Sequence, residues 1–335
     1  MKILKFGILG CGTIGDVHAR ALKEADGAEL VAFCDVNEDR VKEYSSKYGV
    51  KAYSDYNEML SDPEIDAVAI CTPSGMHAEQ SISALKADKH VLVEKPMALT
   101  AKDARAVCEE AKRSKGILSV IFQMRYTDDI RYLKKTIEDG KLGQLTFCDL
   151  YMKYWREDSY YSASPWRGTF AMDGGGALMN QGIHGIDIMH YICGAPKLIG
   201  AKVKTLVHKI ETEDTAAAVV EYASGALGVI EASTSSNPGF DRKIEIHGSR
   251  GYATIIDADI EKLYIDGKLV IDRKVTAAVG TASDPTKMSH EKHLLQYNNF
   301  IGAVHGEEEL VSTAEDGLSA VEFIEQIYEA SKNTN

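Results

Sequence analysis

Three glycines near the start of the chain, Gly10, Gly12 and Gly15, stand between a short apolar run and a segment with helical spacing. In such an arrangement the first glycine permits a tight turn, the second lets the backbone approach a pyrophosphate, and the third lets a helix pack closely on a strand. A second apolar run ends at Asp35, near the offset at which a carboxylate reaches the ribose hydroxyls of a dinucleotide. The order strand, glycine loop, helix, strand and acid therefore predicts a dinucleotide-binding unit.

The residues around this loop also bear on the cofactor. The predicted helix begins beside the loop, so we expect the segment that includes Thr13 and Ile14 to present its free N–H groups to phosphates. Asp35 favours NAD, because its charge would repel the 2′-phosphate of NADP. Arg40 lies near enough in sequence to leave NADP open. The alternative reading is an ordinary glycine turn in an α/β protein.

Composition limits the kinds of partner. The 335 residues suggest about two domains of roughly 150 residues each. The net charge of −12 argues against nucleic acid and acidic membrane surfaces as partners. We expect no signal peptide and no transmembrane helix, because the chain enters a strand at once and lacks a long apolar run. The six cysteines are scattered without a CxxC pair, so we expect neither a disulfide framework nor a zinc site, and no other bound metal. We also expect a cytoplasmic location, where free thiols stay reduced.

The first half alternates strands with helices, which predicts a doubly wound parallel sheet of the Rossmann type. Helices are predicted over residues 37–48, 56–61, 77–87 and 100–114, and strands over residues 67–71, 90–93 and 117–122. Asn37 and Thr100 are the expected N-caps of the first and the last of these helices. Ligands of such sheets bind beyond the carboxyl ends of the strands. The residues predicted to contact the cofactor there are Asp35, Thr72, Pro73, His77, Glu94, Lys95 and Gln123.

Lys95 is the most informative of these residues. Pro96 follows it directly and disfavours a helical conformation at Lys95, which predicts that the ammonium group points off the strand end towards the ligand. The alternative is a solvated surface lysine.

The second half has a different texture, in which short alternating runs are joined by turn pairs. Strands are predicted over residues 146–154, 199–207, 216–222, 226–232, 243–247, 252–256, 262–265 and 268–271. Turns such as Ser224-Gly225 and Asp266-Gly267 indicate hairpins, which require antiparallel pairing. We therefore predict a C-terminal α+β domain built on an open antiparallel sheet. The expected domains are residues 1–124 (NAD-binding), 125–311 (substrate-binding and oligomerisation) and 312–335 (a docking helix with a capping box from Ser312 to Glu315).

A helix-like segment after three glycines at residues 174–176 carries polar residues on one face. Asn180, His184 and Asp187 are spaced i, i+4 and i+7, so they would stack in a row. The alternative for His184 is a buried histidine with satisfied hydrogen bonds. His190, one turn later, is interpreted as packing.

An aromatic-rich loop precedes this segment. Its arginines could hold a carboxylate or phosphate and its rings could stack on a sugar. The predicted substrate contacts are Arg156, Trp166 and Arg167. Packing at a subunit interface or domain junction is an equally open interpretation.

Three motifs together resemble the Gfo/Idh/MocA family of oxidoreductases over essentially the whole chain: GCGTIG near residue 10, CTPSGMH at 71–77 and VEKP at 93–96. The resemblance implies hydride transfer between NAD and a secondary hydroxyl of a sugar, sugar acid or cyclitol. Lys95 matches the family lysine that holds the reacting oxygen, and the proline after it is often cis. The family also implies a homodimer or homotetramer formed through the outer face of the antiparallel sheet.

In the same family His184 matches the acid/base histidine. Asn180 stands where inositol dehydrogenases have an aspartate, and an amide cannot accept a proton at neutral pH. This departure favours relatives that act on nucleotide-linked sugar acids or other hexose derivatives over inositol dehydrogenase proper. The resemblance thus implies that Lys95, His184 and Asn180 act at the reacting carbon, while Asp187 orients the imidazole or binds substrate.

Two rival functions remain at this stage. One is an NAD-binding regulator without turnover. The other is a Rossmann enzyme that uses Cys148 or Cys193 as a nucleophile.

Overall fold

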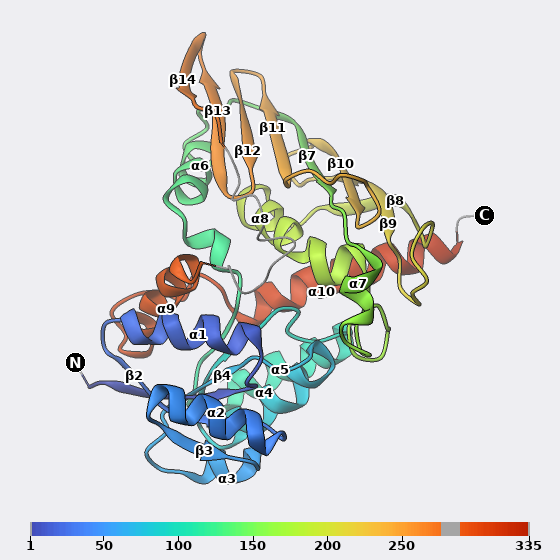
Figure 1. Ribbon diagram of the computed structural model, residues 1–335. Coiled ribbons are helices and arrows are strands. Elements are labelled where there is room, and N and C mark those ends of the chain that lie inside the picture. The colour runs from blue at the N-terminus through green and yellow to red at the C-terminus, as the bar shows by residue number, and fades with distance from the viewer. Residues whose placement is uncertain (1, 276–288, 334–335) are drawn as a thin grey trace. The chain divides into compact units, whose positions relative to one another are not determined.

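A computed structural model describes residues 2–275 and 289–333 (Figure 1). These residues fall into two compact units, one formed by residues 2–123 with 289–318 and the other by residues 124–275 with 319–333. The sequence predicts the first boundary at residue 124 and the second domain over residues 125–311. The difference lies in residues 289–311, which pack with the N-terminal unit.

The first unit contains a six-stranded parallel sheet in the order β3-β2-β1-β4-β5-β6. Its strands are β1 (Leu4–Leu9), β2 (Ala28–Cys34), β3 (Lys51–Tyr53), β4 (Ala67–Ile70), β5 (His90–Val93) and β6 (Leu118–Val120). The strand order reverses between β1 and β4, the point at which doubly wound sheets bind dinucleotides. The parallel Rossmann sheet expected from sequence is confirmed, and the short edge strand β3 was missed.

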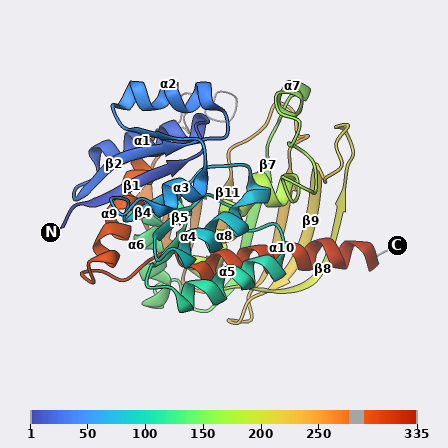
Figure 2. The ribbon, with the colours of Figure 1, turned by 90° about the horizontal axis from the view of Figure 1, so that it is seen from below.

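The helices of this unit connect the strands as expected. They are α1 (Thr13–Glu24), α2 (Glu38–Tyr48), α3 (Tyr56–Ser61), the 3₁₀ turn η1 (Ser74–Met76), α4 (His77–Lys86), α5 (Ala101–Arg113) and α9 (Glu291–Val304). The side chains of Asn37 and Thr100 accept hydrogen bonds from the backbones of Arg40 and Asp103, so both predicted N-caps are confirmed. Figure 2 shows β1 and β4 between α1 and α5.

Helix α9 belongs to the core of the first unit, although the sequence analysis did not predict it. The rings of Phe6 on β1 and Tyr297 on α9 meet edge to face with centroids 5.5 Å apart, and both side chains are fully buried. Phe300 extends the same aromatic cluster. These contacts explain why α9 packs beside α1 (Figure 1).

The second unit contains an eight-stranded sheet in the order β14-β13-β12-β11-β7-β10-β9-β8. Its strands are β7 (Leu145–Lys153), β8 (Lys197–Lys204), β9 (Thr215–Glu221), β10 (Leu227–Ser233), β11 (Lys243–Gly248), β12 (Gly251–Ile256), β13 (Asp259–Ile265) and β14 (Lys268–Asp272). All neighbouring pairs are antiparallel except β7 and β10, which run parallel. The expectation of a wholly antiparallel sheet is therefore corrected to a mixed one. Strands β7 and β10 are far apart in sequence, so no hairpin fixes their relative direction.

One face of this sheet is covered by helix. The helical segments in this part of the chain are η2 (Gln123–Tyr126), α6 (Asp128–Glu138), α7 (Asp158–Ser162), η3 (Ala177–Gly182), α8 (Ile183–Cys193) and α10 (Ala314–Asn333), the last of which begins in residues of the first unit. Helix α8 lies against β7 (Figure 2). The approach is close, because a Cβ at Gly185 would lie 2.7 Å from Sδ of Met152. On β7 the buried apolar side chains Cys148, Leu150 and Met152 alternate along the strand, as the sequence predicted, and the polar Asp149 between them is buried as well.

The start of α10 differs by one residue from the prediction. The capping box is formed by Thr313 and Asp316, whose backbones and side chains exchange hydrogen bonds. The hydroxyl of Ser312 instead donates to the carbonyl of Val120, so Ser312 and Glu315 do not form the box. Among the described residues no helix has the length and apolar character needed to cross a membrane.

Candidate active site

The glycine loop has the geometry that a dinucleotide requires. Gly10 has a φ of +105°, and a Cβ there would lie 2.7 Å from the carbonyl oxygen of Cys71. A Cβ at Gly15 would lie 2.2 Å from the carbonyl oxygen of Gly10, so α1 packs on the loop only because residue 15 is glycine. A Cβ at Gly12 would meet no described atom within 4 Å. Gly12 therefore leaves space for a ligand, whereas the other two glycines satisfy the packing of the fold.

The first turn of α1 faces this loop. The helix begins at Thr13 and Ile14, and its N-cap residue is Gly12, which has no side chain to occupy the free N–H groups. Such a helix start attracts phosphate. The hydroxyl of Tyr44 donates a hydrogen bond to the carbonyl oxygen of Gly12 and so helps to fix the loop.

Asp35 stands at the end of β2 beside the loop. One carboxylate oxygen accepts a hydrogen bond from the backbone of Cys11 and the other from the backbone of Asn37, each at 2.8 Å. These two contacts fix the carboxylate and leave further lone pairs for hydroxyl donors. The side chain of Arg40 is exposed on α2.

The loop after β4 is tied to the segment after β5. His77 is buried, and its two ring nitrogens lie 2.7 Å from the carbonyl oxygen of Pro96 and 2.8 Å from that of Thr72. The Thr72 hydroxyl donates to Gln80. Both nitrogens of His77 are thus engaged by protein, so its side chain shapes the loop around Pro73 instead of offering a hydrogen bond to a cofactor.

The segment after β5 contains Glu94 and Lys95. The peptide bond between Lys95 and Pro96 is cis, as the family resemblance led us to expect. One oxygen of Glu94 accepts the backbone N–H of Lys95, while the other faces two histidines inside the unit. Burial acts to raise the pKa of Glu94, but these imidazoles outweigh it and hold the pKa well below its usual value. Glu94 therefore serves to hold Lys95, and its carboxylate is directed into the protein.

Gln123 ends the first unit. Its side chain is 6% exposed, and its Oε1 has no hydrogen-bond partner among the described residues. An amide oxygen without a partner, just beyond the carboxyl end of β6, can accept a hydrogen bond from a ligand.

The polar helix in the second unit is not one regular α-helix. Residues Ala177–Gly182 form a π-helical turn, and the α-helix starts only at Ile183. The prediction of one α-helical period from Asn180 through Asp187 is therefore wrong. Single π-turns within helices are often found at functional sites. The i, i+4 spacing of Asn180 and His184 therefore does not lie within one regular α-helix.

The buried carboxylate of Glu213 fixes the backbone at the start of this helical segment. The carboxylate of Glu213 accepts hydrogen bonds from the backbones of Gly176 (3.0 Å) and Leu178 (2.8 Å) and from the hydroxyl of Tyr328 (3.0 Å). Burial raises the pKa of Glu213. A Cβ at Gly176 would lie 1.9 Å from the carbonyl of Glu213, and one at Gly175 would lie 2.1 Å from the Tyr328 hydroxyl. The glycine run thus permits a close approach of the backbone to Glu213 and Tyr328 at the start of the helix.

The amide of Asn180 is held by two neighbours. Its nitrogen donates to Asp173, and its oxygen accepts from the side chain of Gln181 at 2.6 Å. Asp173 is 2% exposed and also accepts the backbone N–H of Gly168. Sequence reasoning missed both Asp173 and Gln181, although each lies within a few residues of the predicted site.

His184 lies in the first turn of α8 and is partly buried. One turn later, Asp187 is buried and accepts hydrogen bonds from Nε and Nη2 of Arg125. This ion pair anchors the helix that carries His184.

The aromatic loop contacts the π-turn through its arginines and tyrosines. Nη2 of Arg156 donates to the side chain of Gln181 at 2.6 Å, and the amide of Gln181 donates to the hydroxyl of Tyr160. The guanidinium carbons of Arg167 and Arg156 lie 4.2 and 5.4 Å from the centre of the Tyr160 ring. Trp166 lies beside Arg167 at 5.7 Å. The structure therefore groups Arg156 and Arg167 with the residues next to Asn180.

The cysteines have the character of packing residues. All six are free, and all but Cys193 are buried. A hydrogen bond with Cys148, together with burial, raises the pKa of Cys193 well above its usual value. A thiol in this state is a poor nucleophile, and Cys148 is fully buried, so a cysteine mechanism is disfavoured at both positions.

The chain is similar to known oxidoreductases in both of its halves. A family profile described as "Oxidoreductase family, NAD-binding Rossmann fold" matches residues 4–122, and one described as "GFO/IDH/MocA C-terminal domain" matches residues 130–254. The chain is 35% identical to myo-inositol 2-dehydrogenase of Thermotoga maritima over 254 residues, 74% of each protein. It is 26% identical to D-glucoside 3-dehydrogenase of Escherichia coli, over 98% of this chain and 95% of that protein.

A solved structure is similar over nearly the full length. The WlbA dehydrogenase from Bordetella pertussis, in complex with NADH and UDP-GlcNAcA, superposes with a TM-score of 0.88 at 29% identity. The match covers 99% of this chain and 97% of the other.

Proposed function

Because the chain belongs to the Gfo/Idh/MocA family of oxidoreductases, we propose that it oxidises a secondary hydroxyl of a sugar derivative with NAD as the acceptor. The observation that carries this proposal is the glycine loop. Only Gly12 has an open side, it precedes a free helix start, and Asp35 is fixed beside it. These residues fit the pyrophosphate and ribose of NAD.

The reaction divides between two side chains. When bound, NAD supplies the hydride acceptor. Lys95 hydrogen-bonds the substrate hydroxyl oxygen and stabilises the negative charge that develops on it. His184 removes the hydroxyl proton as the C–H bond breaks. The reverse reaction reduces a ketone with the same residues in opposite roles.

Asn180 positions the substrate. Its amide is already oriented by Asp173 and Gln181, so it offers a fixed hydrogen bond instead of a second base. Two arginines of the aromatic loop, Arg156 and Arg167, contact the neighbours of Asn180, namely Gln181 and Tyr160. Within the described part of the chain, Nε of Arg156 and Nε of Arg167 are both buried without a hydrogen-bond partner.

This arrangement favours an anionic sugar derivative. A carboxylate or phosphate would satisfy guanidinium groups that lack an acidic partner among residues 2–275 and 289–333. Trp166 offers a ring face to the sugar. The structurally similar WlbA dehydrogenase was crystallised with UDP-GlcNAcA, which fits this chemistry better than the uncharged inositol named for the Thermotoga maritima relative. We therefore rank nucleotide-linked sugar acids first and inositol second.

The outer face of the large sheet fits subunit association. Large apolar side chains on strands β7 to β10 of this sheet are 43–56% exposed, namely Phe147, Ile199, Val219 and Leu227. Patches of this kind mark interfaces. We propose a homodimer or homotetramer formed through this face, and a cytoplasmic location in which the free cysteines stay reduced.

A substrate panel tests the proposal. Purified protein is incubated with NAD and, separately, a UDP-linked hexuronic acid, free hexuronic acids, aldoses and inositols, and NADH formation is recorded at 340 nm (about the absorbance maximum of reduced nicotinamide). We expect the highest kcat/KM with the UDP-linked acid. Saturable NAD binding without turnover on any compound would instead support a regulator.

A further inference from the structure

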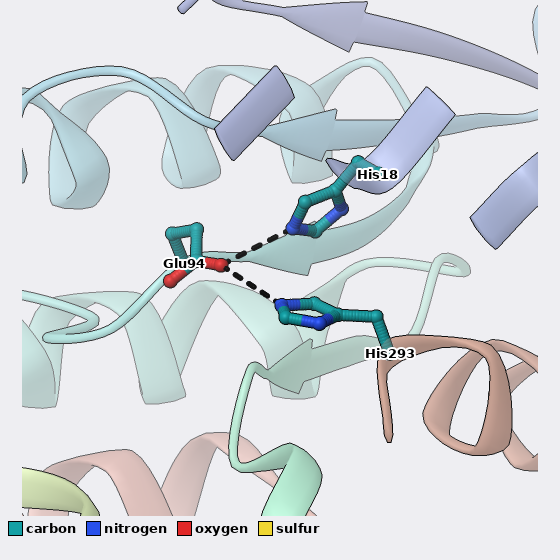
Figure 3. Close-up of side chains that lie close together, drawn as sticks. All are labelled: His18, Glu94 and His293. Atoms are coloured by element: carbon teal, nitrogen blue, oxygen red, sulfur yellow. Dashed lines mark hydrogen bonds and ion pairs between the residues drawn. The ribbon is translucent and has the colours of Figure 1, made fainter. Parts of the chain in front are cut away.

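Three side chains that are distant in sequence meet inside the first unit. His18 comes from α1, Glu94 follows β5 and His293 comes from the first turn of α9, and they are 0, 7 and 1% exposed. Figure 3 shows both imidazoles pointing at the same oxygen of Glu94. Nε2 of His18 lies 3.2 Å from Oε1 of Glu94, and Nε2 of His293 lies 3.6 Å from it. The three ligand atoms all lie within 4.8 Å of one another.

Hydrogen bonds alone leave this cluster unsatisfied. Neither ring nitrogen of His293 has a hydrogen-bond partner among the described residues, although the side chain is almost fully buried. A buried polar group without a partner is costly, and buried polar groups in proteins rarely lack one. His18, in contrast, is fixed from behind, because its Nδ1 lies 2.8 Å from the hydroxyl of Tyr297.

Two of the three separations are close to those in a metal site. Ligand atoms at about 2.0–2.1 Å from a tetrahedral zinc ion are about 3.4 Å apart. The two separations involving Glu94 fall on either side of that value. Two histidine nitrogens and one carboxylate oxygen form a common zinc ligand set, and an outer hydrogen bond to the second nitrogen of a ligand histidine is usual. Tyr297 supplies that outer bond to His18.

The charge of Glu94 also favours a bound cation. The carboxylate of Glu94 is buried, and a buried anion requires a compensating cation. We propose that His18, Glu94 and His293 bind one divalent transition-metal ion of the zinc type, through Nε2, Oε1 and Nε2 respectively. This ion would join α1, the end of β5 and α9.

The proposed site borders the segment that carries Lys95. The oxygen of Glu94 that does not face the histidines accepts the backbone N–H of Lys95 at 3.1 Å. A metal ion bound to the other oxygen would fix the orientation of this carboxylate and thereby the backbone of Lys95. The metal would have a structural role and would not contact the substrate.

Cobalt titration of the full-length protein without a histidine tag tests this inference. After treatment with EDTA and removal of the chelator, Co²⁺ is added and the visible ligand-field absorption is followed. We expect about one equivalent to give the intense bands of tetrahedral cobalt, Zn²⁺ to abolish them by displacement, and Zn²⁺ to raise the melting temperature.

Variants locate the site. His293→Gln and His293→Phe should both abolish the cobalt bands and the zinc-dependent rise in melting temperature. His247→Gln is the matched control, because His247 lies on β11, stacks on Tyr252 and is outside the cluster. Far-UV circular dichroism and NAD binding report whether each variant is folded.

Two results would overturn the inference: no tetrahedral cobalt spectrum from the wild-type protein, or a spectrum that persists in either folded His293 variant. Both readouts concern metal binding, so their failure would leave the proposed oxidoreductase activity unaffected.

Discussion

The guanidinium of Arg125 holds the carboxylate of Asp187 through Nε and Nη2, at distances of 2.6–3.0 Å. Both side chains are almost completely buried, at 3% and 1% exposure. The guanidinium also lies 4.8 Å from the centre of the Tyr191 ring. This pair links η2 to α8 within the second unit and thus sets the helix that carries His184.

Breaking this pair should destabilise the protein strongly. Asp187→Asn would leave the guanidinium of Arg125 buried without its counter-ion, and we expect a loss of about 3–5 kcal/mol in the free energy of unfolding by urea. The control is Arg250→Gln, which breaks an exposed pair with Asp266 and should cost less than about 1 kcal/mol. Equal effects of the two substitutions would refute a special role for the buried pair.

Substitutions of two loop glycines should have different effects, one on NAD binding and the other on stability. Gly12→Ala adds a methyl group where no described atom lies within 4 Å, so we expect an unchanged melting temperature and NAD binding weakened by about tenfold or more. Gly15→Ala forces a Cβ against the carbonyl of Gly10 and should destabilise the fold by about 1–3 kcal/mol. Thermal unfolding and calorimetric NAD titration measure the two effects. Tight NAD binding by Gly12→Ala would argue against this loop as the cofactor site.

Asp35 should control the choice of cofactor. Asp35→Ser would remove the proposed hydrogen bonds to the adenosine ribose and a charge that would repel a 2′-phosphate, so we expect NAD binding to weaken by about 1.5–3 kcal/mol and the ratio of NAD to NADP affinity to fall. The exposed Asp39→Ser on α2 is the control and should change neither value. If Asp35→Ser kept the wild-type cofactor ratio, the ribose would have to lie elsewhere.

Asp214 should make the stability of the second unit depend on pH. Burial acts to raise the pKa of this carboxyl, but hydrogen bonds from the backbone N–H groups of residues 206–208 outweigh it and hold the pKa below its usual value. The carboxylate therefore stabilises the fold above about pH 4, the pKa of an unfolded aspartate, and this contribution is lost as the pH falls towards the folded-state pKa.

The corresponding measurement compares unfolding by urea between pH 3 and 7. Asp214→Asn should be less stable than the wild-type protein by about 1–3 kcal/mol at neutral pH, and the difference should shrink in acid. Asp259→Asn, at an exposed position on β13, should show no such trend. A difference that stays constant with pH would contradict the assignment.

The parts of the fold that follow from local sequence were predictable. The strand, glycine loop and helix around Gly10 to Gly15 form a contiguous pattern, as does the alternation along β7, and the structure confirms both. The caps at Asn37 and Thr100 likewise depend on residues three positions apart.

The parts that depend on distant residues were not predictable. The π-turn at Asn180 begins where Glu213, over thirty residues away, binds the backbone N–H groups of Gly176 and Leu178. The parallel pairing of β7 with β10 and the packing of α9 on α1 are likewise set by tertiary contacts. His18 and His293 carry no motif, so only the fold reveals their approach to Glu94.

The central claim is that Lys95 and His184 carry out the chemistry. The decisive measurement is kcat and KM for NADH formation, with the best substrate of the panel, for Lys95→Met, His184→Ala and the control His190→Ala. His190 bonds Ser319 and packs on Phe323, so its loss should leave kcat near the wild-type value. We expect the other two variants to lose about 10²–10⁴-fold in kcat while binding NAD normally, with the basic group missing from the pH profile of His184→Ala. Wild-type kcat in either Lys95→Met or His184→Ala would contradict the account.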